Sequence, residues 1–188
     1  PVFEALGGGL LGTPLLSTTL AGQLIWRAAG ESAADWLGRL CSGSVGTIAY
    51  LDGGDWGAAN LGVTLSADGT LSGSKSFVAD AGVADCFAVV ASEGGEPVLA
   101  LVERSAIADG ALSKNVLIDL TKRAANVDFT GVNPTQVFRG DAIAAALRDT
   151  LLLGALLTAA ETTGAAGKCL NSISEYLKTR KQFGKLIG

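Results

Sequence analysis

A run of about 40 residues without proline, from Asp141 to Phe183, constrains the fold more than any other feature of this chain. As one helix it would span about 60 Å, far longer than a usual globular helix. Its first half is nearly all apolar around the circumference, so we expect it to be buried on several sides. Asp141 is the predicted N-cap, because short polar side chains cap helix N-termini.

Three glycines interrupt this predicted helix, at Gly154, Gly164 and Gly167. Each costs about 1 kcal/mol relative to alanine in a helix interior. A helix that keeps them is expected to use the missing side chains for close packing or for the approach of a ligand. Of the two, packing is the preferred interpretation.

Residues 45–138 show strand patterns instead. Leu61–Ser66 alternates apolar and polar side chains, and the Asp68-Gly69 pair that follows is the strongest short hairpin signal. A second turn at Glu93–Glu96 separates two apolar runs. The predicted strands are Thr47–Leu51, Leu61–Ser66, Thr70–Val78, Cys86–Ala91, Pro97–Val102, Ala125–Phe129 and Gln136–Phe138. Short strands joined by glycine turns indicate an antiparallel sandwich or barrel, not a parallel sheet with helices between its strands.

Residues 1–44 return to helical spacing, and Pro14 suits the first turn of a helix. We expect the glycines before Pro14 to break any helix there and to form a flexible connector. A phosphate cradle is disfavoured, because no strand precedes these glycines and no Lys-Ser/Thr follows them. The glycines are Gly7, Gly8, Gly9 and Gly12.

The predicted fold class is therefore α+β and multi-domain. Residues 1–44 are the end of an N-terminal helical domain, residues 45–140 are a middle β-barrel or sandwich, and residues 141–188 begin a C-terminal helical bundle. Because the chain starts at Pro1 and stops at Gly188 inside a helical pattern, we expect it to be incomplete at both ends.

Composition excludes several classes of function. The 188 residues include no histidine, which rules out a histidine-based triad and most transition-metal sites within the chain. Cys41, Cys86 and Cys169 are far apart, so we expect small buried hydrophobes and no disulfide framework or zinc site. The net charge of −4, without a Lys/Arg stripe, argues against nucleic acid. No segment is predicted to span a membrane, and a cytoplasmic location is expected.

Two segments resemble the acyl-CoA dehydrogenase family. The sequence from Tyr176 to Gly184 is similar to the family's Y-x-x-x-R-x-x-F-G signature, with Arg180 as its arginine. The sequence Leu71–Asp80, followed by Ala84-Asp85, resembles the family's L-x-G-x-K-x-(W/F)-(I/V) strand and the A-D pair before its next strand. Val2–Gly7 resembles a weaker E-x-(L/I)-G passage. The three occur in the family's order and cover essentially the whole chain.

The resemblance implies an FAD-dependent enzyme that removes hydrogens from Cα and Cβ of an acyl-CoA substrate. Electrons would pass to an electron-transfer flavoprotein, and a homo- or hetero-tetramer is implied. Arg180 would contact the pyrophosphate of FAD in a neighbouring subunit, a task that suits a guanidinium fork. Alongside it, the predicted cofactor-binding residues are Gln182, Phe183, Phe77, Val78, Ala79 and Leu51.

Departures from the family pattern concern both the flavin and the catalytic base. The stretch Ala49–Trp56 lacks the Pro, Ser and Thr of the family's T-E-P-x-x-G-S-D loop, and Ala79 lacks the hydroxyl of the W-I-T strand. Phe77 can still stack on a flavin ring. No catalytic base is identified in this chain, and we expect it beyond Gly188. The alternative position, on the long helix, falls near Gly154 with Ala155 beside it, and Glu161 is interpreted as a bystander.

Three functions remain as hypotheses. The first is an FAD-dependent acyl-CoA dehydrogenase subunit that acts on a thioester. The second is a non-catalytic partner subunit that lends Arg180 to the FAD site of an active homologue. The third is a flavin-free binding module built on the β-domain.

Overall fold

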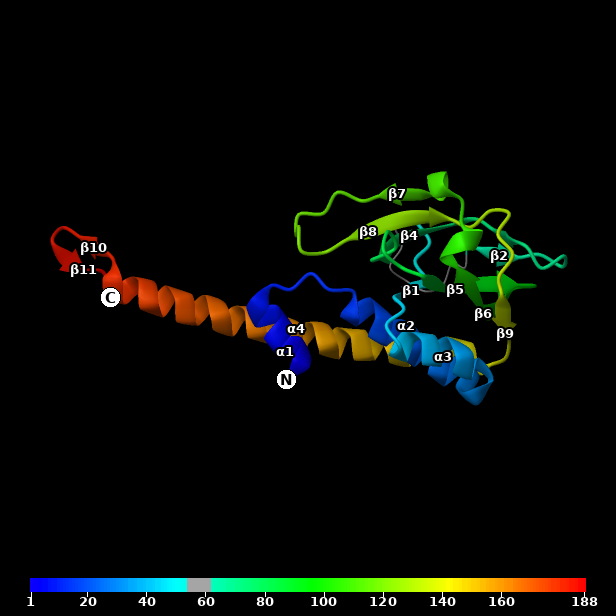
Figure 1. The fold of residues 1–188 in the computed structure, drawn as a ribbon, viewed down its shortest axis with the longest axis horizontal. Helices are drawn as coiled ribbons and strands as arrows, with labels where there is room; N and C mark the ends of the chain where they lie inside the picture. The colour runs from blue at the N-terminus through cyan, green and yellow to red at the C-terminus, as the bar shows by residue number, and fades with distance from the viewer. Residues whose placement is uncertain (54–61) are drawn as a thin grey trace. The chain divides into compact units, whose positions relative to one another are not determined.

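The structure, a computed structural model, describes residues 1–53 and 62–188 (Figure 1). These residues form two compact units. The larger unit is Thr13–Leu152, and the smaller combines Pro1–Gly12 with Leu153–Gly188. The three sequence domains given above stay a prediction.

The helices are α1 (Val2–Gly9), α2 (Leu15–Ala29), α3 (Ala34–Cys41) and α4 (Ala142–Thr179), with 3-10 turns η1 (Gly30–Ala33), η2 (Arg104–Ala106) and η3 (Asp109–Ala111). The strands are β1 (Gly46–Ala49), β2 (Thr64–Leu65), β3 (Leu71–Ser72), β4 (Ser74–Ala79), β5 (Cys86–Glu93), β6 (Glu96–Glu103), β7 (Leu112–Lys114), β8 (Ala124–Asp128), β9 (Gln136–Phe138), β10 (Lys181–Gln182) and β11 (Lys185–Leu186).

Two sheets make up the β-layers of the larger unit. One has the order β3-β2-β5-β6-β9, with β1 also paired to β5, and the other has the order β4-β8-β7. The α+β fold class is confirmed. The expectation of an antiparallel domain needs one correction, because β1 and β2 both run parallel to β5. A two-residue hairpin cannot join parallel neighbours, because it reverses the direction of the chain. Longer stretches of chain therefore separate β1 and β2 from β5.

Strand β5 is buried on both faces, because successive side chains of a strand point to opposite sides. Phe87 and Val89 enter the core between the two sheets, where Phe87 meets Phe129 edge-on with ring centroids 6.0 Å apart. Ala88 and Val90 enter a second core, which α2, α3 and the first turns of α4 complete on the other side of the sheet. The larger unit is therefore three layers thick, with one helical layer and two of strands (Figure 1).

Both predicted glycine turns are present. Gly94 and Gly95 have φ values of 61° and 93°, between the paired residues Glu93 and Glu96. Two successive positive φ values define the type I′ turn that suits the twist of a hairpin. Gly69, with φ 83°, similarly closes the β2–β3 hairpin.

The N-terminal glycines do not form the predicted connector, because α1 runs from Val2 to Gly9 and contains three of them. The reason is packing within the smaller unit. A Cβ added to Gly7 would lie 1.8 Å from the backbone oxygen of Glu161, and one added to Gly164 would lie 1.8 Å from that of Glu4. The backbones of α1 and α4 thus touch where both helices lack a side chain. The packing role predicted for α4 glycines holds at Gly164.

Helix α4 begins at Ala142, directly after the predicted N-cap Asp141, and ends at Thr179. The prediction of a helix through Phe183 is wrong for its last residues, which form the β10–β11 hairpin. Within the larger unit, Ile143, Ala146 and Leu147 are buried in the second core. By length and composition alone α4 would be able to cross a membrane. Only 28% of its most apolar stretch is buried, so the expectation that its first half is buried on several sides is wrong.

The three cysteines differ in their surroundings. Cys86 is buried as expected, whereas Cys41 and Cys169 are exposed, which corrects the prediction for those two. Burial raises the pKa of the Cys86 thiol from 9.0 to about 11, against a smaller opposing effect of Arg39. The neutral thiol is therefore the form that the fold accepts.

The raised pKa of Cys86 predicts a loss of stability in alkali. Below pH 9 the thiol is neutral in both states, and between pH 9 and pH 11 only the unfolded chain ionises. The free energy of unfolding should fall across this window by up to roughly 2–3 kcal/mol more than in Cys86→Ala. Urea unfolding of the wild type and of Cys86→Ala at pH 8 and pH 10.5 measures the difference. The other titrating groups affect both proteins equally, so their contributions cancel. Parallel losses in the two proteins would contradict this prediction.

Candidate functional site

A β-bulge in β4 presents the first of the predicted cofactor residues. Lys75 pairs with Val127 and Val78 pairs with Ala125, so two residues of β4, Ser76 and Phe77, face Asn126 alone. Phe77 has φ 50°, a left-handed conformation that is rare for a bulky residue, and the residue is 44% exposed. Bulges occur preferentially beside active sites, where they redirect a side chain.

Two hydrogen bonds that are not part of the backbone pairing between β4 and β8 hold this bulge. The N–H of Ser76 donates to the carbonyl of Leu51 over 2.8 Å. The N–H of Phe77 donates to the side-chain Oδ1 of Asn126 over 3.2 Å. The structure thus brings the predicted residues Leu51 and Phe77 to one place, although they lie far apart in the sequence.

The next two predicted residues continue β4. Val78 is buried in the core between the sheets, whereas Ala79 is exposed. The carbonyl of Ala79 accepts a hydrogen bond from the Thr47 hydroxyl over 2.6 Å, which ties the end of β4 to β1. Asp80, at φ 53°, then accepts hydrogen bonds from Ser17 of α2 over 2.6 Å and from Arg123 over 3.0 Å.

A buried ion pair beneath the bulge was not predicted from the sequence. The Nζ atom of Lys75 lies 2.8 Å from Oδ1 and 2.9 Å from Oδ2 of Asp52, and 3.2 Å from the carbonyl of Tyr50. Lys75 is fully buried, and burial lowers its pKa while Asp52 opposes that change. The sequence did contain a signal for a buried lysine. In a strand, Lys75 falls on the same face as the apolar Leu71, four residues before it. The pair fixes residues 50–52 against β4.

Part of the predicted flavin loop lies outside the described residues. Of the stretch Ala49–Trp56, Gly54, Asp55 and Trp56 fall between the two described ranges. Ala49 and Leu51 are buried, and Tyr50 is half-buried with a pKa raised by burial.

The remaining predicted cofactor residues lie in the smaller unit, at the β10–β11 hairpin. Arg180 directly follows α4, and its carbonyl accepts the N–H of Ile187 over 3.1 Å. Gln182 precedes a two-residue turn made by Phe183 at φ 51° and Gly184 at φ 78°. Phe183 is fully exposed in a conformation that usually selects Asn or Gly. The hairpin therefore presents Arg180, Gln182 and Phe183 to the outside.

Gly154 and Ala155, the helix positions at which the resemblance would put a catalytic base and its neighbour, carry no acid or base. Gly154 is buried and has no side chain, and Ala155 is exposed. Glu161 is half-buried, and its backbone oxygen lies at the α1 crossing. The assignment of the base to a position beyond Gly188 stays a prediction.

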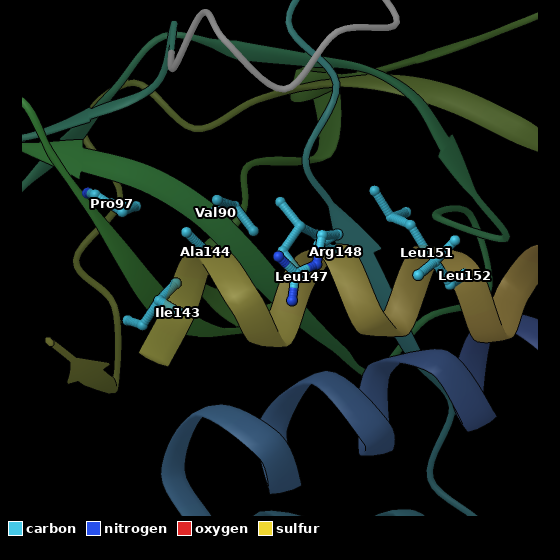
Figure 2. Close-up of a pocket in the computed structure, with 8 residues that line it drawn as sticks. All are labelled: Val90, Pro97, Ile143, Ala144, Leu147, Arg148, Leu151 and Leu152. Carbon is cyan, nitrogen blue, oxygen red and sulfur yellow. The ribbon is translucent and has the colours of Figure 1, made fainter. Parts of the chain in front are cut away.

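An apolar pocket of about 400 Å³ lies in the larger unit, between α4 and the sheet (Figure 2). Val90 of β5 and Pro97 of β6 form one wall. The other wall is formed by the α4 residues Ile143, Ala144, Leu147, Arg148, Leu151 and Leu152. Its one charged residue, Arg148, pairs with Asp149 at 3.2 Å. None of the predicted cofactor residues lines this pocket, and it supplies no acid or base for catalysis.

No protein-family model matches this chain. Over 187 residues the chain is 32% identical to acyl-CoA dehydrogenase IpdE2 of Mycobacterium tuberculosis, an alignment that covers 100% of this chain and 46% of the relative. The chain thus spans about half the length of the curated relative that it matches.

Solved structures share the fold over the same extent. The Tcur3481–Tcur3483 steroid ACAD aligns with a TM-score of 0.79 and 29% identity, covering 99% of this chain and 51% of that one. Butyryl-CoA dehydrogenase from Megasphaera elsdenii aligns with a TM-score of 0.83 and 24% identity, covering 98% and 53%. PigA with FAD and proline aligns with a TM-score of 0.82 and 23% identity, covering 99% and 54%.

The last two structural matches support the fold alone, because their sequence identities are below 25%. IpdE2 adds a match in sequence along the entire chain. Over its whole length this chain is therefore similar to acyl-CoA dehydrogenases, in sequence to IpdE2 and in fold to the solved structures.

Proposed function

We propose that this chain is part of an FAD-dependent subunit that carries out α,β-dehydrogenation of an acyl-CoA thioester, with an electron-transfer flavoprotein as the electron acceptor. The observation that supports it best is Phe77, an exposed aromatic side chain on a strained bulge at the position where the family's strand meets the flavin. A strained conformation persists only where surrounding contacts enforce it, and such residues cluster at functional sites.

The residues present fit a flavin in part. The exposed ring of Phe77 suits stacking on a flat heterocycle, and Ala79, which is also exposed, ends the same strand. By the same resemblance, Arg180, with Gln182 and Phe183 beside it, would contact the pyrophosphate of the FAD bound in a neighbouring subunit. When bound, FAD supplies an acceptor for a hydride equivalent. Ala79 contributes no hydroxyl, so this chain's own residues offer stacking and backbone contacts.

A second candidate is a non-catalytic subunit that completes the FAD site of an active homologue. Ala79, Gly154 and Ala155 favour it, because each lacks the polar group that the corresponding family position uses. In that role the exposed Arg180 and Phe183 would serve the partner's cofactor.

Flavin absorbance of the purified protein separates these functions. Stoichiometric flavin in the homo-oligomer supports the dehydrogenase subunit, and half-stoichiometric flavin that requires an active homologue supports the partner subunit. A protein that stays colourless alone, with added FAD and with such a homologue would be a flavin-free binding module, and the proposal would be wrong.

Arg180→Ala is expected to weaken FAD retention at least about tenfold, because a charge-assisted contact to a phosphate is lost. Folding should change by less than about 0.5 kcal/mol, since Arg180 is exposed. Flavin content after gel filtration measures the first effect, and thermal unfolding measures the second. Lys185→Ala, which removes an exposed charge from the same hairpin, is the matched control. Equal flavin content in Arg180→Ala and the control would count against the assigned role.

A further inference from the structure

We propose that Asn126 is a positioning residue that holds the β4 bulge and thereby presents Phe77 to the flavin. This inference rests on the proposed function, and it assigns a role to a residue of β8 that no sequence motif indicated. The side chain acts through its amide oxygen on the backbone of Phe77.

The geometry of the bulge requires an acceptor from outside the ladder. Lys75 and Val78 both have backbone partners on β8, and Asn126 is the residue left between those partners. The N–H of Phe77 is therefore taken by a side chain, the Oδ1 of Asn126, over 3.2 Å. A backbone N–H near the sheet that lost this partner would have to find another, because unpaired donors are costly.

The orientation of the Asn126 amide is itself fixed. Its Oδ1 also accepts a hydrogen bond from Nδ2 of Asn115 over 3.3 Å, so one carbonyl oxygen receives two donors. Rotating the Asn115 amide by half a turn would set two oxygens against each other. Asn115 keeps the orientation even though its own Oδ1 is buried without a hydrogen-bond partner among residues 1–53 and 62–188.

The position of the Phe77 ring depends on this bond. Without the bulge, β4 would carry one residue fewer between Lys75 and Val78, and a one-residue change of register moves a side chain to the other face of a sheet. The second tether, from Ser76 to Leu51, holds the neighbouring residue. The bond to Asn126, by contrast, acts on the backbone of the strained residue directly.

Asn126→Ala and Asn126→Asp test the backbone contact. Alanine removes the acceptor, and aspartate keeps an oxygen at the same place. Hydrogen exchange of the Phe77 amide, read by NMR, should accelerate at least about tenfold in Asn126→Ala and stay within about threefold of wild type in Asn126→Asp. Ser113→Ala, which changes the residue paired with Asn126 on β7, is the control and should leave the rate unchanged. An unchanged Phe77 rate in Asn126→Ala would overturn the inference.

FAD affinity, from the quenching of flavin fluorescence, tests the consequence for the site. It should fall about tenfold in Asn126→Ala and be restored in Asn126→Asp, with the exchange of core amides in β5 unchanged. A faster Phe77 amide with wild-type FAD affinity would overturn the positioning role and leave the proposed function standing. Absence of FAD binding in the wild type and all variants would contradict the proposed function. It would also contradict the part of this inference that concerns FAD affinity.

Discussion

Replacing Lys75 by methionine is expected to lower the free energy of unfolding by about 3–5 kcal/mol. Lys75 is fully buried, and its ammonium group lies within 2.9 Å of both carboxylate oxygens of Asp52. Methionine is of similar length and leaves little cavity, but it leaves the nearly buried Asp52 carboxylate without its cation. Urea unfolding followed by circular dichroism measures the change.

Two further variants separate the pair from its parts. Lys75→Met combined with Asp52→Leu removes both charges, and replacement of a whole buried pair by apolar groups is often close to neutral, so most of the stability should return. Glu103→Gln breaks the exposed pair with Arg39, where Nη2 and Oε2 are 2.9 Å apart, and should cost less than about 1 kcal/mol. A Lys75→Met variant no less stable than Glu103→Gln would show that the buried pair contributes little.

Gly164→Ala is expected to displace α1 from α4 in the smaller unit. The added Cβ would lie 1.8 Å from the backbone oxygen of Glu4, and backbone cannot yield as a flexible side chain can. Overpacking of this kind costs about 1–3 kcal/mol, and more where no rearrangement is open. Because a helix of 8 residues has little stability of its own, limited proteolysis should cut residues 1–12 much faster than in the wild type.

Gly167→Ala is the matched control for the crossing, because it lies on the same helix with nothing within 4 Å of an added Cβ. This substitution should stabilise α4 by up to about 1 kcal/mol, since alanine is the better helix former. Opposite signs at Gly164 and Gly167 are therefore expected in thermal unfolding. Equal stabilisation by both alanines would show that α1 does not rest on Gly164.

Much of the fold followed from local patterns. The period of 3.6 residues placed α2 and α4, and alternation with glycine turns placed the hairpins at Gly69 and at Gly94-Gly95. Local patterns failed where a distant contact overrode them. Gly7, Gly8 and Gly9 have poor helix propensity, yet all three are helical, and at Gly7 the lack of a side chain admits the backbone of α4.

The candidate site was predictable as a set of positions but not as a geometry. The motif around Phe77 identified the strand, whereas the bulge arises from register with β8, which no local pattern records. Likewise Lys75 is part of the sequence motif, but its ion pair with Asp52 depends on the tertiary fold, which packs residues 50–52 against β4. Asn126 had no signal at all, since a polar residue in a half-exposed strand is unremarkable in one sequence.

Strand β5 gives the larger unit one consequence beyond its architecture. Its alternate side chains form a wall of the core between the sheets and a wall of the core under the helices. Opening either core therefore exposes one face of β5, on which the other core also packs. We expect the helical layer and the two sheets to unfold together, so the surface around Phe77 should be as stable as the helices on the other side of the strand.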